Sequence, residues 1–149
     1  MIKKMLVALD GSEHSDRALD FALEIAEKFS SEVVLISVVD YAAPYFVAGG
    51  TIDALPLYWE QFSVDLRKSH EDLLSKAREK AQKAKPDLVI TKELIEGRPA
   101  DKIIEAAKQG DFDVIFVGSR GIGGIKEFFL GSVSDRVADE APCPVVIVK

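Results

Sequence analysis

The sequence has little cysteine and histidine: one cysteine, Cys143, and two histidines, His14 and His70, among 149 residues. One cysteine excludes a disulfide within the chain and any metal site built from several thiolates. The apolar run that follows MIKKM stops at Asp10, too early for a signal peptide or a membrane span. These absences predict a cytoplasmic chain with no membrane partner, in which Cys143 is a small buried apolar residue.

Basic side chains are also in the minority. The 25 acidic residues outnumber the 19 basic ones, and the net charge of -6 opposes binding to a phosphate backbone. The lysine-rich stretch 76–85 mixes alanine and glutamate at helical spacing, which is typical of a solvated helix face. We therefore expect no nucleic-acid partner.

Short apolar runs alternate with helix-like segments along the chain. Strands are expected over residues 4–9, 33–39, 88–95, 113–117 and 145–148, and helices over 15–29, 63–84, 99–108 and 132–140. The run 88–95 is more polar than the others and belongs near an edge of the sheet. This alternation predicts an α/β fold, in which a parallel open sheet has helices on both faces. The length fits a single domain, residues 1–149.

The first predicted helix carries an apolar stripe that is expected to pack on the sheet. Its members are Ala18, Phe21, Ala22, Ile25, Ala26 and Phe29.

The segment 41–62 interrupts the alternation, because it is too long for an ordinary connection and holds two glycines and two prolines. Insertions of this length are commonly lids, binding loops or disordered segments. Its five aromatic residues before Phe62 argue against disorder and predict packing on the domain or on a partner.

Ligands of an open α/β sheet bind beyond the carboxyl ends of its strands. Asp10 directly follows the first strand, so its carboxylate is expected at this rim. There it could accept hydrogen bonds from ribose hydroxyls or bind a metal. The alternative is a turn aspartate in Asp-Gly-Ser that caps the first helix or its approach.

The stretch GSRGIGGIKEFFLGSVSDR, residues 118–136, is rich in glycine and then opens a helix. Glycines permit positive φ and let backbone N–H groups approach an anion. Gly131 and Ser132 begin a helix whose first N–H groups and dipole attract negative charge. Ser134 adds a hydroxyl, and Arg120 and Lys126 add positive charge, although Lys126 also fits a mobile surface side chain. The loop is therefore expected to hold phosphate.

Neither common phosphate motif explains this loop. The Walker A motif requires Gly-Lys before Ser or Thr, and the Rossmann fingerprint requires a glycine where Lys126 stands. The observed spacing is Gly118-x-x-Gly121, nine residues, then Gly131-Ser132. It resembles the signature of the ATP-binding branch of the universal stress protein family. EVVLISVVD, EGRPADKIIEAA, DFDVIFVGSRG and APCPVVIVK extend the resemblance, in the same order, over nearly the whole chain.

The resemblance implies a Rossmann-like sheet of five parallel strands in the order 3-2-1-4-5, a homodimer, and bound ATP that can carry Mg²⁺ or Mn²⁺. The residues it places around the nucleotide are Ala8, Leu9, Asp10, Val38, Val117, Gly118, Ser119, Arg120, Gly121, Gly131, Ser132, Val133 and Ser134. Asp10 would meet ribose or adenine, and the Val38 backbone would meet adenine. Residues 118–121 would line the ribose and phosphates, and residues 131–134 would hold the triphosphate. Ala8 and Leu9 would supply apolar contact.

The C-terminal strand favours a dimer independently of the resemblance. It is apolar on both faces, yet in the implied order it lies at an edge, where free hydrogen-bonding groups invite pairing. The predicted homodimer contact comprises Val145, Val146, Ile147 and Val148.

Taken together, the sequence predicts a nucleotide-binding regulatory protein with slow or no hydrolysis. Fast hydrolysis requires metal ligands and a positioned water or base, and no second acid stands beside the loop. His14 and His70 are expected to be solvated surface side chains, so no catalytic residue and no resident metal site are predicted. Two alternatives stay open: an ATPase or nucleotide-transferring enzyme, and a nucleotide-free dimeric interaction module.

Overall fold

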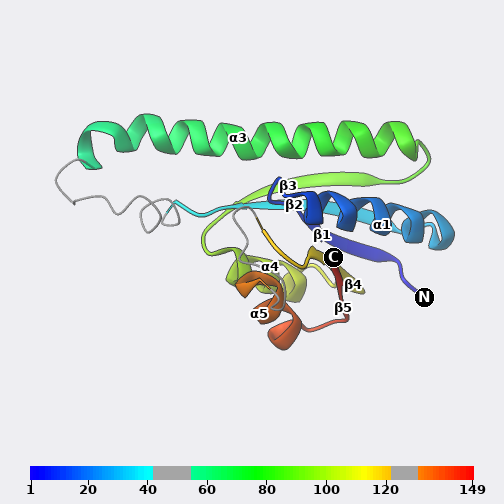
Figure 1. The fold of residues 1–149 in the computed structure, drawn as a ribbon. Helices are drawn as coiled ribbons and strands as arrows, with labels where there is room; N and C mark the ends of the chain where they lie inside the picture. The colour runs from blue at the N-terminus through cyan, green and yellow to red at the C-terminus, as the bar shows by residue number, and fades with distance from the viewer. Residues whose placement is uncertain (42–54, 122–130) are drawn as a thin grey trace.

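The computed structural model describes residues 1–41, 55–121 and 131–149, and it contains one parallel sheet. Its strands are β1 (Lys4–Ala8), β2 (Glu32–Val39), β3 (Ile90–Glu96), β4 (Val114–Gly118) and β5 (Val145–Val148). They lie in the order β3-β2-β1-β4-β5, with every neighbouring pair parallel (Figure 1). This confirms the predicted fold class and places the polar strand β3 at an edge.

Helices cover both faces of the sheet. Helices α1 (Glu13–Phe29) and α3 (Leu55–Ala84) lie on one face, and α4 (Pro99–Gln109) and α5 (Ser132–Glu140) lie on the other (Figure 1). Helix α3 begins at Leu55 instead of Ser63, so the end of the segment 41–62 forms its first two turns. Residues 42–54, the rest of that insertion, lie outside the described part of the chain. Among the described helices, none is long and apolar enough to cross a membrane.

Two apolar layers hold the helices to the sheet. Strand β1 sends Met5 and Val7 toward α1 and α3, and sends Leu6 toward α4 and α5, and all three side chains are fully buried. This alternation is the period-two geometry of a strand that is covered on both faces. It explains why the inner strand β2 has valine, leucine or isoleucine at six of its eight positions.

Helix α1 packs on the sheet through part of the predicted stripe, Ala18, Ala22 and Ala26, but the buried face is turned toward Leu19 and Leu23 instead of Phe21 and Phe29. Its buried residues are Ser15, Ala18, Leu19, Ala22, Leu23 and Ala26. Phe21 and Phe29 were expected in the stripe but are 44% and 46% exposed. Leu19 and Leu23 occupy the buried side because small alanines alternate with them and let the helix approach the sheet closely. The Phe21 ring reaches only the margin of this contact, where it lies edge-on to Phe116 at 6.2 Å.

Cys143 is half-buried and packs against the apolar layer under α4 and α5. Burial raises the pKa of its thiol, so little thiolate forms near neutral pH. The side chain therefore serves as a small apolar group, as the sequence predicts.

Candidate functional site

Asp10 stands at the exit of β1 with its two carboxylate oxygens in different surroundings. The Ser12 backbone N–H donates to Asp10 Oδ1 at 2.9 Å, which closes a turn before α1. The other oxygen, Oδ2, faces Gly121, where an added Cβ would lie only 2.6 Å away. Asp10 is thus a turn residue that also presents an oxygen to the loop after β4.

The loops after β1 and β4 are joined by further contacts. Ser12 Oγ donates to the carbonyl of Arg120 at 3.3 Å, and Ser12 Oγ also accepts the Ser15 N–H as the cap of α1. Arg120 as a whole is half-buried. Lys126, the other predicted cation of the loop, lies outside the described residues.

Close packing, and not backbone conformation, explains the signature glycines Gly118 and Gly121, and at Gly131 an added Cβ would be tight, 3.2 Å from the Ser119 carbonyl. A Cβ on Gly118 would lie 2.8 Å from the backbone of His14 and Ser15 at the start of α1. Among the described glycines, positive φ occurs only at Gly11 (84°) and Gly97 (139°). The expectation of positive φ in the signature was therefore wrong for Gly118, Gly121 and Gly131. Their missing side chains let α1, the Asp10 carboxylate and the start of α5 come together.

The carbonyl of Ser119 anchors the start of α5. It accepts the Gly131 N–H at 2.8 Å and lies 3.1 Å from the Ser134 hydroxyl, which also reaches the Gly131 carbonyl at 3.0 Å. Ser134 is only 2% exposed. In this structure its hydroxyl holds the helix start against the β4 loop, and it does not face solvent.

The first turn of α5 has backbone donors to offer. The first helical hydrogen bond runs from the Asp135 N–H to the Gly131 carbonyl, so the N–H groups of residues 132–134 precede it. Gly131, the N-cap, provides no side-chain hydrogen bond to them. Backbone donors at the positive end of a helix dipole suit an anion, which is the role predicted for Ser132 and Val133.

The apolar residues of the predicted site divide between the two faces of the sheet. Ala8, Val38 and Val117 pack on the α4 and α5 side, whereas Leu9 is 4% exposed and packs under α1 and α3. Leu9 can therefore offer mainly its backbone to a ligand at the Ala8 side. The Leu9 N–H donates to the Ile36 carbonyl at 2.8 Å. Because peptide groups alternate along a strand, those of Val38 point the same way, into the space beyond β1.

Both histidines are buried more deeply than predicted. His14 Nδ1 lies 2.9 Å from Ser119 Oγ, and His70 Nδ1 lies 2.7 Å from Ser37 Oγ. Each side chain is half-buried, so the prediction of solvated surface histidines was wrong. The sequence contained one signal: Ser37 is the only polar residue between Glu32 and Asp40. A buried hydroxyl there requires a hydrogen-bond partner.

Burial lowers the pKa of His70, and the Asp10 carboxylate opposes that shift in part. The imidazole is therefore mainly neutral at pH 7. No group of three or more histidine, cysteine or acidic side chains at metal-binding spacing occurs within residues 1–41, 55–121 and 131–149.

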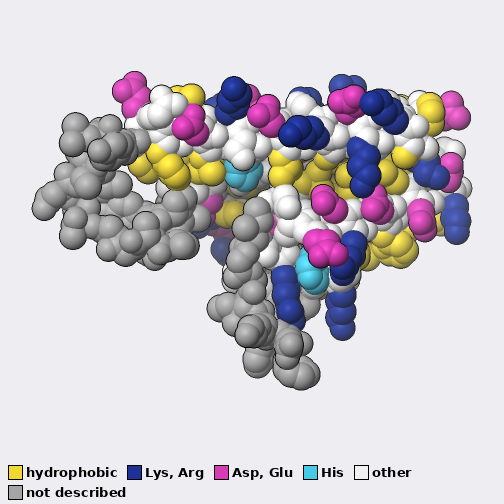
Figure 2. Space-filling view, turned by 45° about the horizontal axis from the view of Figure 1, so that its top comes forward, with side chains coloured by type: hydrophobic (Ala, Val, Ile, Leu, Met, Phe, Trp, Pro, Cys, Tyr) yellow, Lys and Arg dark blue, Asp and Glu magenta, His cyan; other side chains and the backbone are white. Residues whose placement is uncertain are grey.

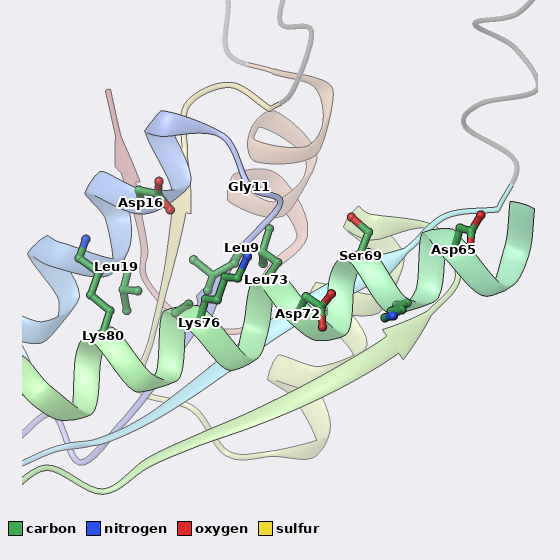
Figure 3. Close-up of a pocket in the computed structure, with 12 residues that line it drawn as sticks. Leu9, Gly11, Asp16, Leu19, Asp65, Ser69, Asp72, Leu73, Lys76 and Lys80 are labelled. Carbon is green, nitrogen blue, oxygen red and sulfur yellow. The ribbon is translucent and has the colours of Figure 1, made fainter.

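A separate groove of about 640 Å³ lies between α1 and α3. Its floor is apolar, from Leu9, Leu19, Leu73 and Ala77, and Lys76 and Lys80 extend along its rim (Figure 3). Figure 2 shows these apolar side chains between the charged surfaces of the two helices. The groove is on the opposite face of the sheet from Ala8 and Val38, and it meets the candidate site at Leu9 and Gly11.

Comparison with known proteins agrees with this arrangement. The model of the universal stress protein family matches residues 1–149. Universal stress protein YxiE of Bacillus subtilis is 36% identical over 150 residues, covering all of both chains. Universal stress protein UspA from Lactobacillus plantarum has a similar structure, with a TM-score of 0.84 at 23% identity, covering 99% of this chain and 98% of that one. A universal stress protein from Archaeoglobus fulgidus in complex with dAMP gives 0.67 at 25% identity, with both chains fully covered. The chain therefore belongs to the universal stress protein family.

Proposed function

We propose that this protein binds ATP at the carboxyl ends of β1, β2 and β4 and acts as a nucleotide-dependent regulatory protein of the stress response. One observation carries the proposal: Asp10 Oδ2 faces Gly121, near the start of the loop that begins at Gly118, and α5 begins where that loop ends, at Gly131, which has no side chain to cap it. A carboxylate suits ribose hydroxyls, and free helix donors suit phosphates. The related protein from Archaeoglobus fulgidus, solved with dAMP, supports a nucleotide as the ligand.

Each part of the nucleotide has a proposed contact. Asp10 and Gly121 meet the ribose, the Val38 peptide groups and the Ala8 side chain meet adenine, and the N–H groups of residues 132–134 meet the phosphates. Residues 117–120, at the end of β4 and the start of the loop that follows it, would shape that loop around the nucleotide. A Mg²⁺ or Mn²⁺ ion would take most of its ligands from phosphate oxygens and water. Residues 1–149 would act as one domain, and the single cysteine fits a reducing cytoplasm.

Denaturing the freshly purified protein and identifying the released small molecule by mass tests this proposal, together with calorimetric titration by ATP. Gly131→Val is expected to weaken ATP binding, because a Cβ at this position would lie 3.2 Å from the Ser119 carbonyl and displace the start of α5. Gly110→Ala, at the C-cap of α4 and away from the candidate site, is the control and should bind ATP normally. The absence of both extracted nucleotide and measurable ATP affinity would contradict the proposal and favour a nucleotide-free interaction module.

Slow or no hydrolysis is part of the proposed function. Steady multiple turnover of ATP with Mg²⁺, abolished by Asp10→Ala without loss of folding, would instead indicate an ATPase or a nucleotide-transferring enzyme.

We also propose that β5 pairs with β5 of a second copy. The carbonyl of Pro144 accepts from Ile115 of β4 and that of Val148 accepts from Ser119, the residue after β4, so the alternating peptide groups of Val145 and Ile147 point away from β4. All four residues of this edge strand are only half-buried within one chain. An edge strand of this kind is open to pairing.

Ile147→Pro is expected to convert the dimer into a monomer, because it removes an outward donor and leaves the bonds to β4 in place. Ile147→Ala removes more apolar side chain than the proline substitution but keeps the N–H, so a dimer that persists in this control attributes the effect of proline to the lost N–H. Sedimentation equilibrium measures both. A wild-type protein that is monomeric at high concentration, or a proline variant that still dimerises, would refute pairing through β5.

A further inference from the structure

A chain of hydrogen bonds connects α3 with the exit of β1. His70 Nδ1 lies 2.7 Å from Ser37 Oγ, and Ser37 Oγ lies 2.8 Å from the carbonyl oxygen of Leu9. Ser37 is 1% exposed, in the middle of the otherwise apolar strand β2. The hydroxyl is thus held inside the protein between an imidazole and a main-chain carbonyl.

The direction of these bonds follows from the number of protons available. A carbonyl only accepts, so the single hydroxyl proton of Ser37 is donated to Leu9. Ser37 must then accept from His70, which requires a proton on Nδ1. In the neutral ring, Nε2 carries no proton.

The bond to Leu9 bears directly on Asp10, the next residue. The Leu9 N–H is held by the Ile36 carbonyl at 2.8 Å, and the Leu9 carbonyl is held by Ser37. The Asp10 N–H, on the other side of the same peptide, points to Ser15 Oγ at 3.4 Å. Fixing this peptide plane sets the direction in which the Asp10 carboxylate leaves the backbone.

We propose that His70 is a positioning residue for the nucleotide site, which orients Asp10 through Ser37 and the Leu9 carbonyl. This inference rests on the proposed function, because Asp10 is the residue that would meet the ribose. Ser37 and His70 lie on the α1 and α3 side of the sheet, opposite Ala8 and Val38. His70 therefore acts on Asp10 from the face of the sheet opposite the proposed adenine contacts.

His70→Ala is expected to weaken ATP binding by about 2- to 10-fold, the usual effect of losing one neutral hydrogen bond. His70→Asn should recover most of the affinity, since its side-chain amide can donate to Ser37 in place of Nδ1. In an Asp10→Ala background, His70→Ala should cost less than about twofold, because no carboxylate is left to position. Ser69→Ala, an exposed neighbour on α3, is the control. Calorimetry gives the affinities, and urea unfolding checks that each variant is folded.

A folded His70→Ala variant that binds ATP as tightly as the wild type would overturn this inference while leaving the proposed function intact. An equal loss of affinity with and without Asp10 would also overturn it, because the effect would then be general and structural. If the wild type itself binds no ATP, the proposed function fails first. A two-bond ¹H–¹⁵N correlation spectrum of the free protein provides a readout without nucleotide: the proton is expected on Nδ1 of His70, and a proton on Nε2 alone would break the chain.

Discussion

Replacing Gly118 with alanine is expected to destabilise the protein by about 1–3 kcal/mol and to abolish ATP binding at concentrations that saturate the wild type. The added Cβ would lie 2.8 Å from His14 C, His14 Cβ and Ser15 N. Two of these atoms belong to the main chain, so the contact is relieved only if the start of α1 moves away from β4. Such a movement would displace the Ser12 cap and the turn that holds Asp10.

Urea unfolding and calorimetric titration measure the two effects of Gly118→Ala separately. Gly110→Ala is the control, because it makes the same chemical change at the C-cap of α4, away from the candidate site, where the two nearest atoms belong to the ring of Phe112 and the third is the Ala106 carbonyl at 3.1 Å. A side-chain ring can turn aside more easily than a helix can shift. If Gly118→Ala is as stable as the wild type and binds ATP normally, close packing is not the reason for a glycine at this position.

Replacing Asp10 with alanine is expected to weaken ATP binding by about 10- to 100-fold, the range for losing a hydrogen bond to a charged group. The substitution removes the carboxylate oxygen that faces Gly121 and also the acceptor for the Ser12 N–H. A modest loss of stability should accompany the loss of affinity, since the turn before α1 loses one contact. Calorimetry at constant pH and salt measures the affinity, and thermal unfolding measures the stability.

Asp10→Asn separates these two roles. Its side-chain oxygen can still accept from Ser12, so the stability of the wild type should be retained. The lost negative charge should nevertheless reduce affinity for ribose hydroxyls, which donate more strongly to a carboxylate. If both variants bind ATP like the wild type, Asp10 is a turn residue only, and the ribose contact must be sought elsewhere.

The course of the chain through the sheet was predictable because it depends on local pattern. Runs of valine, leucine and isoleucine separated by helical segments can be buried on both faces only in a parallel sheet. The bounds of α5 and β5 agree with the prediction, residues 132–140 and 145–148. The start of α3 was missed because the prolines and aromatic residues before Ser63 are typical of a loop, whereas the helix extends back to Leu55.

The side-chain contacts of the site were harder to predict. A helix has several apolar residues around its circumference, and only packing decides that Leu19 and Leu23 of α1 are buried while Phe21 and Phe29 are half-exposed. His70 meets Ser37 although 33 residues separate them. No local pattern reports a contact between a helix and a strand so far apart in the sequence.

By itself, the sequence determined approximately where the strands end and the glycine spacing from Gly118 to Gly131, because each depends on residues close together in the chain. The strand order was implied by the resemblance to the family and not by any local pattern. Only the tertiary structure shows why those glycines are needed. Gly118 admits the backbone of α1 and Gly121 admits the Asp10 carboxylate, and both neighbours come from the other end of the chain. A glycine can signal freedom of φ or closeness of a neighbour, and only the folded protein brings that neighbour within a few ångströms.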